Sequence, residues 1–213
     1  MILNNKDTIL MIGDSVTDSN RERPVGRYLW GLGNGYVSYI DALLGYLYPD
    51  IDQKIVNMGI AGDTIRDLKY RWNSDVISQN PDWVSIMIGI NDVWRHFDQP
   101  SDHLSLISPV EYATTINTLI KRTIHHVKGI ILMSPFYIIA SLDNVMRQET
   151  LYYAHIMESI SIRYKTRFVH TQAWLDAYMS GTGAKRLSND GVHPNPLTNM
   201  ILANAWIHEG MDG

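Results

Sequence analysis

Five short apolar runs, rich in Ile, Val and Met, recur along the chain, and segments with a helical spacing of apolar residues separate them. Most of the runs are apolar throughout rather than alternating, which is typical of strands that are covered on both faces of a parallel sheet. The alternation of such strands with helices predicts a three-layer, doubly wound α/β domain with a five-stranded parallel sheet. The expected strands are residues 8–12, 54–58, 83–88, 129–133 and 167–170.

The segments between these runs carry signals for helix starts and stops. Ser108 and Pro109 are typical of an N-cap and of the first helical position, and Glu111 completes a capping-box pattern. Pro49 ends the first expected helix. We expect helices over residues 36–48, 64–79, 145–164 and 197–208, and another that begins at Ser108.

The longer irregular stretches mostly follow the strands. In doubly wound sheets the ligand crevice lies beyond the carboxyl ends of the strands, so these loops are expected to build the site. No linker-like composition divides the chain, and residues 1–213 are expected to form one domain. The loops in question are residues 16–35, 92–107, 135–144 and 176–195.

Composition narrows the choice of partner and compartment. The chain has 213 residues with 18 basic and 22 acidic side chains, and this net charge of −4 argues against a nucleic-acid or anionic-membrane partner. Cysteine is absent, so disulfides and thiolate metal sites are excluded. No apolar run approaches the length of a membrane span or of a signal-peptide core, and we expect a cytoplasmic protein.

Two short segments at opposite ends of the chain carry the groups of a hydrolytic site. Ser15 follows the first expected strand in the turn Gly13-Asp14-Ser15, and Asp190 and His193 stand three residues apart before the last helix. A serine hydroxyl, a histidine base and an acid that orients the base are the parts of an acyl-transfer triad. An ordinary turn or helix cap is the alternative for the first segment. A metal site is the alternative for the second, but two ligands are too few and no His-Glu-x-x-His pattern is present.

Two further loops after expected strands supply hydrogen-bond donors. The segment from Gly59 to Gly62 leads into a helix, where the Gly62 amide could face an anion. Asn91 follows the third strand, and its side-chain amide could stabilise developing negative charge. A tight strand-to-helix turn and an ordinary Asx turn are the alternatives. The joint placement of these segments with Ser15 at one edge of the expected sheet favours the catalytic interpretation.

The chain resembles the SGNH (GDSL-type) hydrolase superfamily in four blocks, in the family's order and over essentially the whole length. The blocks are Gly13-Asp14-Ser15, Gly59-x-x-Gly62, Gly89-x-Asn91-Asp92 and Asp190-x-x-His193. The resemblance implies a flavodoxin-like α/β/α sandwich that uses no metal or cofactor. It also implies that Ser15 is the nucleophile, His193 the base and Asp190 its orienting acid. The Ser15 amide, the Gly62 amide and the Asn91 side chain would form the oxyanion hole.

Within that superfamily, four stretches are similar to bacterial acetylxylan and acetyl-xylooligosaccharide esterases: Arg23-Pro24, Gly33-x-Gly35-Tyr36-Val37, residues 81–95 and residues 129–133. The similarity implies a serine esterase that removes O-acetyl groups from an acetylated oligosaccharide through an acetyl-serine. Sugars stack on aromatic faces, although large aromatics are equally common in cores and interfaces. Arg95 suits either a sugar hydroxyl or a carboxylate partner such as Asp92 or Asp98. The candidate substrate contacts are Asp14, Trp30, Trp94, Arg95 and Tyr137, with Tyr36 near the mouth.

Two other functions stay open for this sequence. A short-chain esterase or lysophospholipase-like hydrolase would carry the same triad, and a catalytically silent protein would bind carbohydrate without turning it over. Self-association is a separate question. Trp174, Tyr178 and Trp206 are expected to be exposed, and they could serve self-association into a homo-oligomer.

Overall fold

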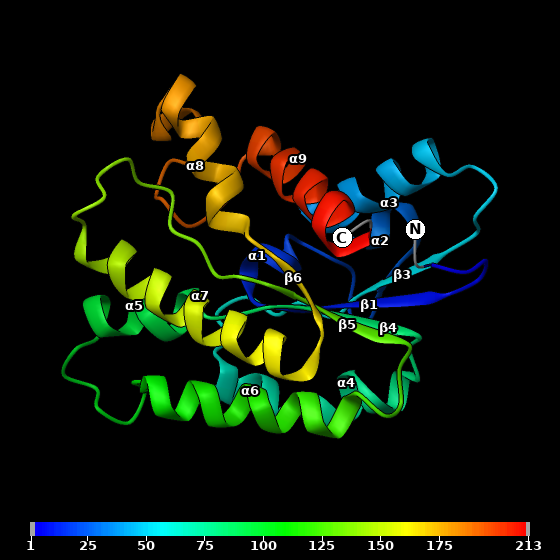
Figure 1. The fold of residues 1–213 in the computed structure, drawn as a ribbon, viewed down its shortest axis with the longest axis horizontal. Coiled ribbons are helices and arrows are strands. Elements are labelled where there is room, and N and C mark those ends of the chain that lie inside the picture. The colour runs from blue at the N-terminus through cyan, green and yellow to red at the C-terminus, as the bar shows by residue number, and fades with distance from the viewer. Residues whose placement is uncertain (1–2, 212–213) are drawn as a thin grey trace.

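The computed structural model describes residues 3–211, and a six-stranded sheet runs through its centre (Figure 1). The strands are β1 (Thr8–Gly13), β2 (Gly26–Arg27), β3 (Lys54–Asn57), β4 (Trp83–Met87), β5 (Gly129–Met133) and β6 (Arg167–Val169). They lie in the order β2-β3-β1-β4-β5-β6, and neighbours are parallel except for β2 against β3. The five strands expected from the apolar runs are therefore present, each ending within a residue of its expected end.

The expectation of five strands was wrong because it missed β2 at the sheet edge. This strand is only two residues long, and it pairs Gly26 with Asn57 and Arg27 with Val56 in the antiparallel direction. Neither Gly26 nor Arg27 belongs to an apolar run, so a search for buried strands passes over them. The loop after β1 forms this strand simply by returning along the exposed edge of β3.

Without β2, the strand order is that of a flavodoxin-like sheet. From β1 the chain moves to β3 on one side and then crosses to β4 on the other. Ligands bind in such sheets beyond the carboxyl ends of the strands, at the point where this direction reverses. Here that point lies between the ends of β1 and β4, where Gly13 and Met87 stand opposite each other.

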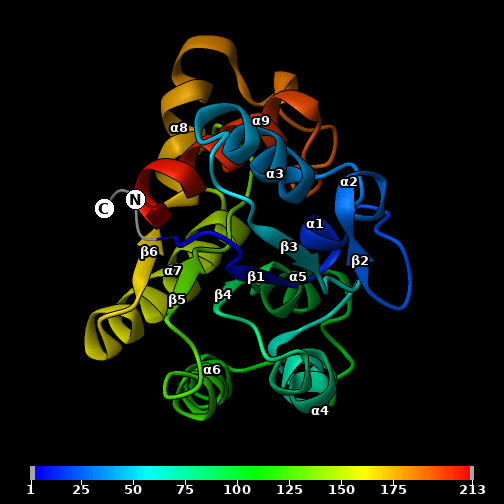
Figure 2. The ribbon, with the colours of Figure 1, turned by 90° about the vertical axis from the view of Figure 1, so that its right-hand side faces the viewer.

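Helices cover both faces of the sheet (Figure 2). One face carries α3 (Tyr36–Leu47), α8 (Thr171–Thr182), α9 (Pro196–Ala205) and a final π-helical turn, η3 (Trp206–Met211). The opposite face carries α4 (Ile65–Asp75), α5 (Ile90–Asp98), α6 (Pro109–Thr123) and α7 (Val145–Tyr164). The remaining pieces are α1 (Ser15–Asp18), α2 (Tyr28–Gly31) and two 3-10 turns, η1 (Ile77–Gln79) and η2 (Ala184–Arg186). Among residues 3–211, every helix is too short or too polar to cross a bilayer.

Two hydrophobic cores follow from the alternation of side chains along each strand. Ile9 and Met11 of β1 pack on the side of α3 and α9, whereas Leu10 and Ile12 pack on the side of α4 and α6. All four are completely buried, and each such side chain contributes about 1.5–3 kcal/mol. The continuous apolar runs are thus explained by burial on both faces. The prediction of a single domain over residues 1–213 stays a prediction.

The expected start of α6 is confirmed, with one correction. Ser108 is the N-cap, its Oγ accepts from the Glu111 amide at 3.2 Å, and Pro109 opens the helix. The Glu111 carboxylate does not complete a capping box, because it pairs with Arg66 of α4 instead. The complete capping box belongs to α4 itself, where Thr64 and Asp67 bind each other's backbone amides.

Three of the four expected loops contain helices, and the stretch 16–35 holds most of α1 as well as α2. Helix α5 occupies the start of the stretch 92–107, and α8 occupies the start of the stretch 176–195. Both carry apolar residues at helical spacing, such as Ile90 and Val93 in α5 and Leu175 and Met179 in α8, and these residues pack into the two cores. The helical spacing of these apolar residues was therefore visible in the sequence, and it was overlooked because loops were expected directly after the strands.

Three aromatic residues differ from their expected surroundings. Trp206 is completely buried, and its indole N–H donates to Ser85 Oγ of β4 at 3.0 Å, so it offers no surface for association. Tyr36 is also completely buried, with its hydroxyl 3.1 Å from Thr17 Oγ1. Tyr178 is exposed, as expected, while Trp174 packs partly against the core.

Candidate active site

The turn that carries Ser15 is built by tight packing at the end of β1. A Cβ atom on Gly13 would lie 2.2 Å from the Met87 carbonyl oxygen, so only glycine fits there. Asp14 then caps α1, because its Oδ1 accepts from the Val16 amide at 2.9 Å. Ser15 is the first residue of this four-residue helix and is half-buried at the sheet edge. The hydroxyl is thereby held at the switch point of the sheet.

The loop before α9 brings the histidine to this serine. Ser15 Oγ lies 3.1 Å from His193 Nε2, although 178 residues separate the two in sequence. On the other side of the ring, His193 Nδ1 lies 2.6 Å from Asp190 Oδ2. An ionised carboxylate only accepts hydrogen bonds, so Nδ1 carries the proton and Nε2 presents its lone pair to the serine hydroxyl. This arrangement prepares Nε2 to remove the hydroxyl proton.

The two oxygens of Asp190 have separate tasks. While Oδ2 binds the imidazole, Oδ1 accepts from the Val192 amide at 2.9 Å and the His193 amide at 2.8 Å. Partial burial raises the pKa of Asp190, but the hydrogen bonds from His193 and Val192 outweigh it and hold the pKa well below its ordinary value. Asp190 is therefore ionised wherever His193 is able to act as a base.

Sequence reasoning missed Ser188 as a support of this loop. Its hydroxyl lies 3.0 Å from Asp190 Oδ1 and 2.9 Å from the His193 carbonyl oxygen, and the Gly191 amide donates to it at 3.0 Å. A serine two residues before an aspartate is too common a pattern to signal such a role.

The loop after β3 leaves one amide unused. Neighbouring amides are all engaged: Gly59 with Asn57, Ile60 with the Gly13 carbonyl, Ala61 with Asp18, Asp63 with the Ile60 carbonyl and Thr64 with Asp67. The Gly62 amide has no hydrogen-bond partner within residues 3–211, and neither does the Ser15 amide. Gly62 has φ +88°, a conformation that favours glycine, and open space lies beside its Cα. The loop thus presents a donor that is free to meet an anion.

Asn91 and Asp92 follow β4 and join this loop. Asn91 Nδ2 donates to the Asp63 carbonyl oxygen at 2.9 Å, which uses one of its two N–H groups and leaves the other. The Asp92 carboxylate accepts from the Ile65 amide, the first of α4, at 3.0 Å. Burial raises the pKa of Asp92 to about 7. Both side chains tie the segment after β4 to the segment after β3.

The candidate substrate contacts divide into two groups. The Trp94 ring meets the His193 ring edge-on with centroids 6.3 Å apart, and Tyr137 packs so closely on Gly191 that a Cβ there would lie 2.7 Å from its ring. Trp94 and Tyr137 therefore border the histidine loop.

The other three candidates lie differently. Arg95 is paired with Asp98 at 2.5 Å, one of the alternatives that the sequence left open, and Trp30 is 90% exposed on α2. Asp14 is only 1% exposed and serves as the helix cap, so it has no surface for a substrate. Burial also raises the pKa of Asp14 to about 7.

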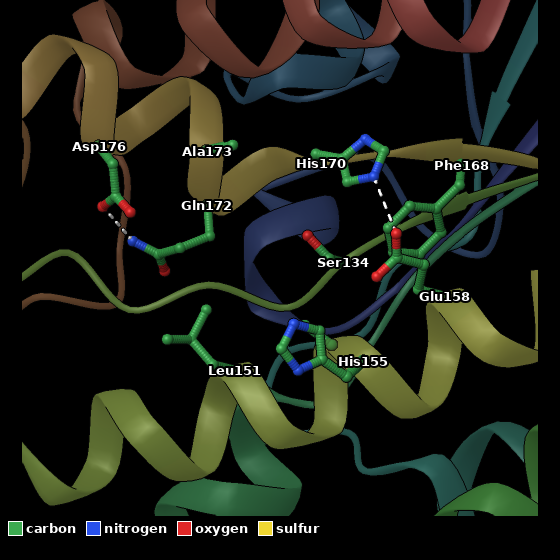
Figure 3. A pocket seen from close by; sticks show the side chains of 10 residues that line it. Ser134, Leu151, His155, Glu158, Phe168, His170, Gln172, Ala173 and Asp176 are labelled. Atoms are coloured by element: carbon green, nitrogen blue, oxygen red, sulfur yellow. Dashed lines mark hydrogen bonds and ion pairs between the residues drawn. The ribbon is translucent and has the colours of Figure 1, made fainter.

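A cavity of about 180 Å³ lies between α7 and the segment from β6 into α8 (Figure 3). Two pairs of its polar side chains are in contact: His170 Nε2 lies 3.2 Å from Glu158, and Gln172 donates to Asp176 at 2.8 Å. Neither the serine, the histidine nor the aspartate of the site lines it. In the part of the chain that the structure describes, no three His, Asp or Glu side chains gather as metal ligands.

Comparisons with known proteins agree with this geometry. Residues 11–200 match the model of the GDSL-like lipase/acylhydrolase family. The chain is 44% identical to an acetylxylan esterase of Geobacillus stearothermophilus over 210 residues, which covers 98% of this chain and 96% of that one. A crystal structure of an acetylxylan esterase from that organism superimposes with a TM-score of 0.96 at 43% identity, with the same coverage.

Further solved structures match as well. Catalytic mutants of the same Geobacillus esterase superimpose with the same TM-score of 0.96. An alpha/beta hydrolase enzyme from the metagenome of Lake Arreo, Spain, is 35% identical with a TM-score of 0.95, over 97% of this chain and 96% of that chain.

Proposed function

This chain belongs to the GDSL-like lipase/acylhydrolase family, and on that basis we propose that it is a serine esterase that removes O-acetyl groups from acetylated xylooligosaccharides. The observation that carries the proposal is the contact of Ser15 Oγ with His193 Nε2, backed by the bond from His193 to Asp190. Its family membership and its similarity to an acetylxylan esterase make the chain a carboxylic-ester hydrolase. The geometry of the site supports a reaction in two halves, the acetylation of Ser15 and the hydrolysis of the acetyl-serine.

In the first half of the reaction, Ser15 Oγ attacks the acetyl carbonyl carbon while His193 Nε2 accepts the hydroxyl proton. The resulting oxyanion is stabilised by the Ser15 amide, the Gly62 amide and the free N–H of Asn91. The intermediate then collapses, the bond to the sugar oxygen breaks, and His193 gives its proton to the departing sugar hydroxyl. Acetyl-serine remains on the enzyme.

In the second half, water replaces the sugar. His193 Nε2 takes a proton from the water molecule, whose oxygen attacks the acetyl-serine carbonyl, and the same three donors hold the second oxyanion. Collapse releases acetic acid, which loses its proton to the solvent and becomes acetate, and returns the proton from His193 to Ser15 Oγ. Asp190 remains ionised throughout and stabilises the imidazolium that forms twice in each cycle.

The choice of carbohydrate substrate rests on the similar enzymes and on the surroundings of His193. Trp94 and Tyr137 offer aromatic surface beside the histidine loop, which suits the apolar face of a sugar ring. The chain is similar over almost its entire length to an enzyme that is an acetylxylan esterase.

The direct experiment measures acetate released from a panel of acetylated xylooligosaccharides and other acetylated sugars, with Ser15→Ala as the blank. We expect release from the xylooligosaccharides and a loss of several orders of magnitude in the variant, with the fold retained. We also expect a fluorophosphonate probe to label wild-type protein at Ser15. If Ser15→Ala released as much acetate as the wild-type protein, Ser15 would be excluded as the nucleophile. If the wild-type protein released no acetate, the site would be that of a catalytically silent carbohydrate-binding protein.

An acyl-length series separates the deacetylase from a general acyl hydrolase. We expect kcat/KM on 4-nitrophenyl esters to fall steeply from acetate to octanoate, and acetylated xylooligosaccharides to be better substrates than 4-nitrophenyl acetate. A preference for the octanoate ester would instead identify a lysophospholipase-like hydrolase.

A further inference from the structure

We propose that Arg71 is a positioning residue that sets the spacing of the oxyanion-hole donors, an inference that rests on the proposed function. Arg71 lies on α4 and touches none of the reacting atoms. Its guanidinium instead joins the backbone at the end of β1 to the loop after β3, and these two segments carry the Ser15 and Gly62 amides.

One planar group makes four hydrogen bonds to three segments of the chain. Nη2 donates to the Gly13 carbonyl oxygen at 3.0 Å, and Nη1 donates to the Met58 carbonyl oxygen at 2.7 Å. Nε binds Asp63 Oδ2 at 2.6 Å, and Nη1 also binds Asp75 Oδ2 at 2.8 Å. The side chain is 10% exposed, so water competes little for these contacts. Of the four bonds, only the one to Asp75 stays within α4.

The acceptors of Arg71 flank the donors of the oxyanion hole. Gly13 comes two residues before Ser15, and Asp63 directly follows Gly62. Asp63 also joins the third donor, because its carbonyl oxygen accepts from Asn91 Nδ2. A displacement of the guanidinium would therefore move all three donors relative to one another.

The sheet alone does not determine this spacing. Register pairing of β1 with β3 ends at Met11 and Asn57, before either donor is reached. Beyond that pair, the Met58 amide bonds to the Met11 carbonyl at 2.8 Å and the Ile60 amide to the Gly13 carbonyl at 3.0 Å. Asp18 and Asn57 add side-chain links between the two segments, and Arg71 is the link that holds Gly13, Met58 and Asp63 together. Arg21 holds the same loop from the other side, since its Nε donates to the Gly59 carbonyl oxygen at 2.7 Å.

The charge of Arg71 also controls the Asp63 carboxylate. Burial raises the pKa of Asp63 to about 6, against the opposing effect of Arg71. Without the guanidinium, Asp63 would take up a proton more readily and would lose its strongest partner. The Asp63 carboxylate would then take up its proton at a higher pH than in the wild-type protein, and the hydrogen bonds of the loop that holds Gly62 would change in that higher range.

Lysine cannot replace this arginine. A guanidinium presents five N–H groups in a fixed plane, whereas an ammonium is a single point of charge. An ammonium at this place keeps the charge near Asp63 and Asp75 but cannot span both carbonyl oxygens. Arg71→Lys thus removes the alignment while it keeps the charge.

Helix α4 provides a matched control. Arg66 also makes four hydrogen bonds, two to the Glu111 carboxylate and two to the carbonyl oxygens of Leu104 and Leu106. None of these acceptors belongs to the site, and the Arg66 side chain is more exposed than that of Arg71. Arg66→Lys therefore reports what the loss of such a fork does to the protein away from the oxyanion hole.

The test compares Arg71→Lys with Arg66→Lys on 4-nitrophenyl acetate, at a temperature where circular dichroism shows both variants folded. We expect Arg71→Lys to lower kcat at least tenfold with KM changed less than twofold. We also expect the variant to bind a trifluoromethyl ketone inhibitor more weakly by the same factor, because the ketone oxygen becomes an oxyanion when the serine adds to its carbonyl carbon. Arg66→Lys should change each quantity less than twofold. If Arg71→Lys does not fold, Arg71→Gln carries the same expectation.

The proposal is overturned if the folded Arg71 variant keeps more than half of the wild-type kcat, or if Arg66→Lys lowers kcat equally. A second readout is the pH profile of kcat, in which we expect an added dependence above pH 6 for Arg71→Gln, which removes the charge beside Asp63, and none for Arg71→Lys or Arg66→Lys. Each measurement compares a variant with the wild-type protein on 4-nitrophenyl acetate, so the result does not depend on which sugar the natural substrate contains. Failure of the proposed function would appear instead as an active Ser15→Ala protein.

Discussion

Replacing Asp190 by asparagine tests what orients the catalytic histidine. The substitution keeps one oxygen as an acceptor and replaces the other, which faces the imidazole, by an N–H donor. An asparagine whose Oδ1 takes the place of the aspartate Oδ1 still accepts from the Val192 and His193 amides, so the loop is retained. Its amide nitrogen then faces His193 Nδ1 as a donor. The ring must accept at Nδ1, which moves its proton to Nε2, and Nε2 can no longer remove a proton from Ser15.

The expected loss is large in turnover and small in stability. A wrong tautomer in a serine triad lowers kcat by about 10³–10⁴-fold, which corresponds to about 4–5.5 kcal/mol of barrier. Hydrogen bonds to a charged acceptor are stronger than those to a neutral one, and the Asp190 side chain is 46% exposed. Solvent screening therefore limits the loss of unfolding free energy to about 1 kcal/mol.

Steady-state hydrolysis of 4-nitrophenyl acetate and thermal unfolding together decide the outcome. Asp190→Ala removes both oxygens and serves as the comparison, so it should lower Tm further than Asp190→Asn does. An Asp190→Asn protein that keeps a tenth of the wild-type kcat would refute the assignment of separate tasks to the two oxygens. A variant that loses activity only because it unfolds would show a Tm below the assay temperature.

Three further predictions concern the loops around the oxyanion hole. Asn91→Ala should lower kcat about 100-fold with little change in KM, because the donor acts on charge that develops only in the transition state; an effect confined to KM would contradict this. The raised pKa of Asp92, about 7, means that its stabilisation is complete below the unfolded value of 3.8 and is lost as the pH rises through 7. Asp92→Asn should therefore flatten the change of unfolding free energy between pH 4 and pH 8 by about 4 kcal/mol in urea titrations, and an unchanged slope would show that Asp92 is already ionised at pH 4. Gly59→Ala should not fold, since its Cβ would lie 2.3 Å from the Asp18 amide, whereas Gly62→Ala meets open space and should lose only about 1–2 kcal/mol from its positive φ, as thermal unfolding will show.

The elements that the sequence predicted well are those whose signal is local or is spread over a whole strand. The apolar runs gave five strands, each ending within a residue of its expected end, because burial on both faces demands the same residue types in any protein of this class. The start of α6 was equally visible, since Ser108 and Pro109 act within one turn. Edge strand β2 carries no comparable pattern, and only its pairing with β3 explains it.

The site shows the same division. Ser15, Gly62, Asn91, Asp190 and His193 were expected at one sheet edge, and the structure brings Ser15 and His193 into contact there. Asp14 was taken for a substrate contact, but a residue beside a nucleophile can equally cap the helix that follows, and the sequence cannot distinguish the two. The catalytic roles of Ser15, Gly62, Asn91, Asp190 and His193 stay proposals that the variants above will test.

From its sequence alone, the chain is committed to a parallel sheet between two layers of helices and to the groups that its loops carry, because strand burial and the chemistry of the side chains are properties of short segments. Only the tertiary structure decides how those groups are held. Arg71 pairs with Asp75 four positions later, which from sequence resembles an ordinary surface ion pair on a helix. Folding turns the same guanidinium inward onto Gly13, Met58 and Asp63, and no pattern along one helix can report contacts to two strand ends that lie far from it in the chain.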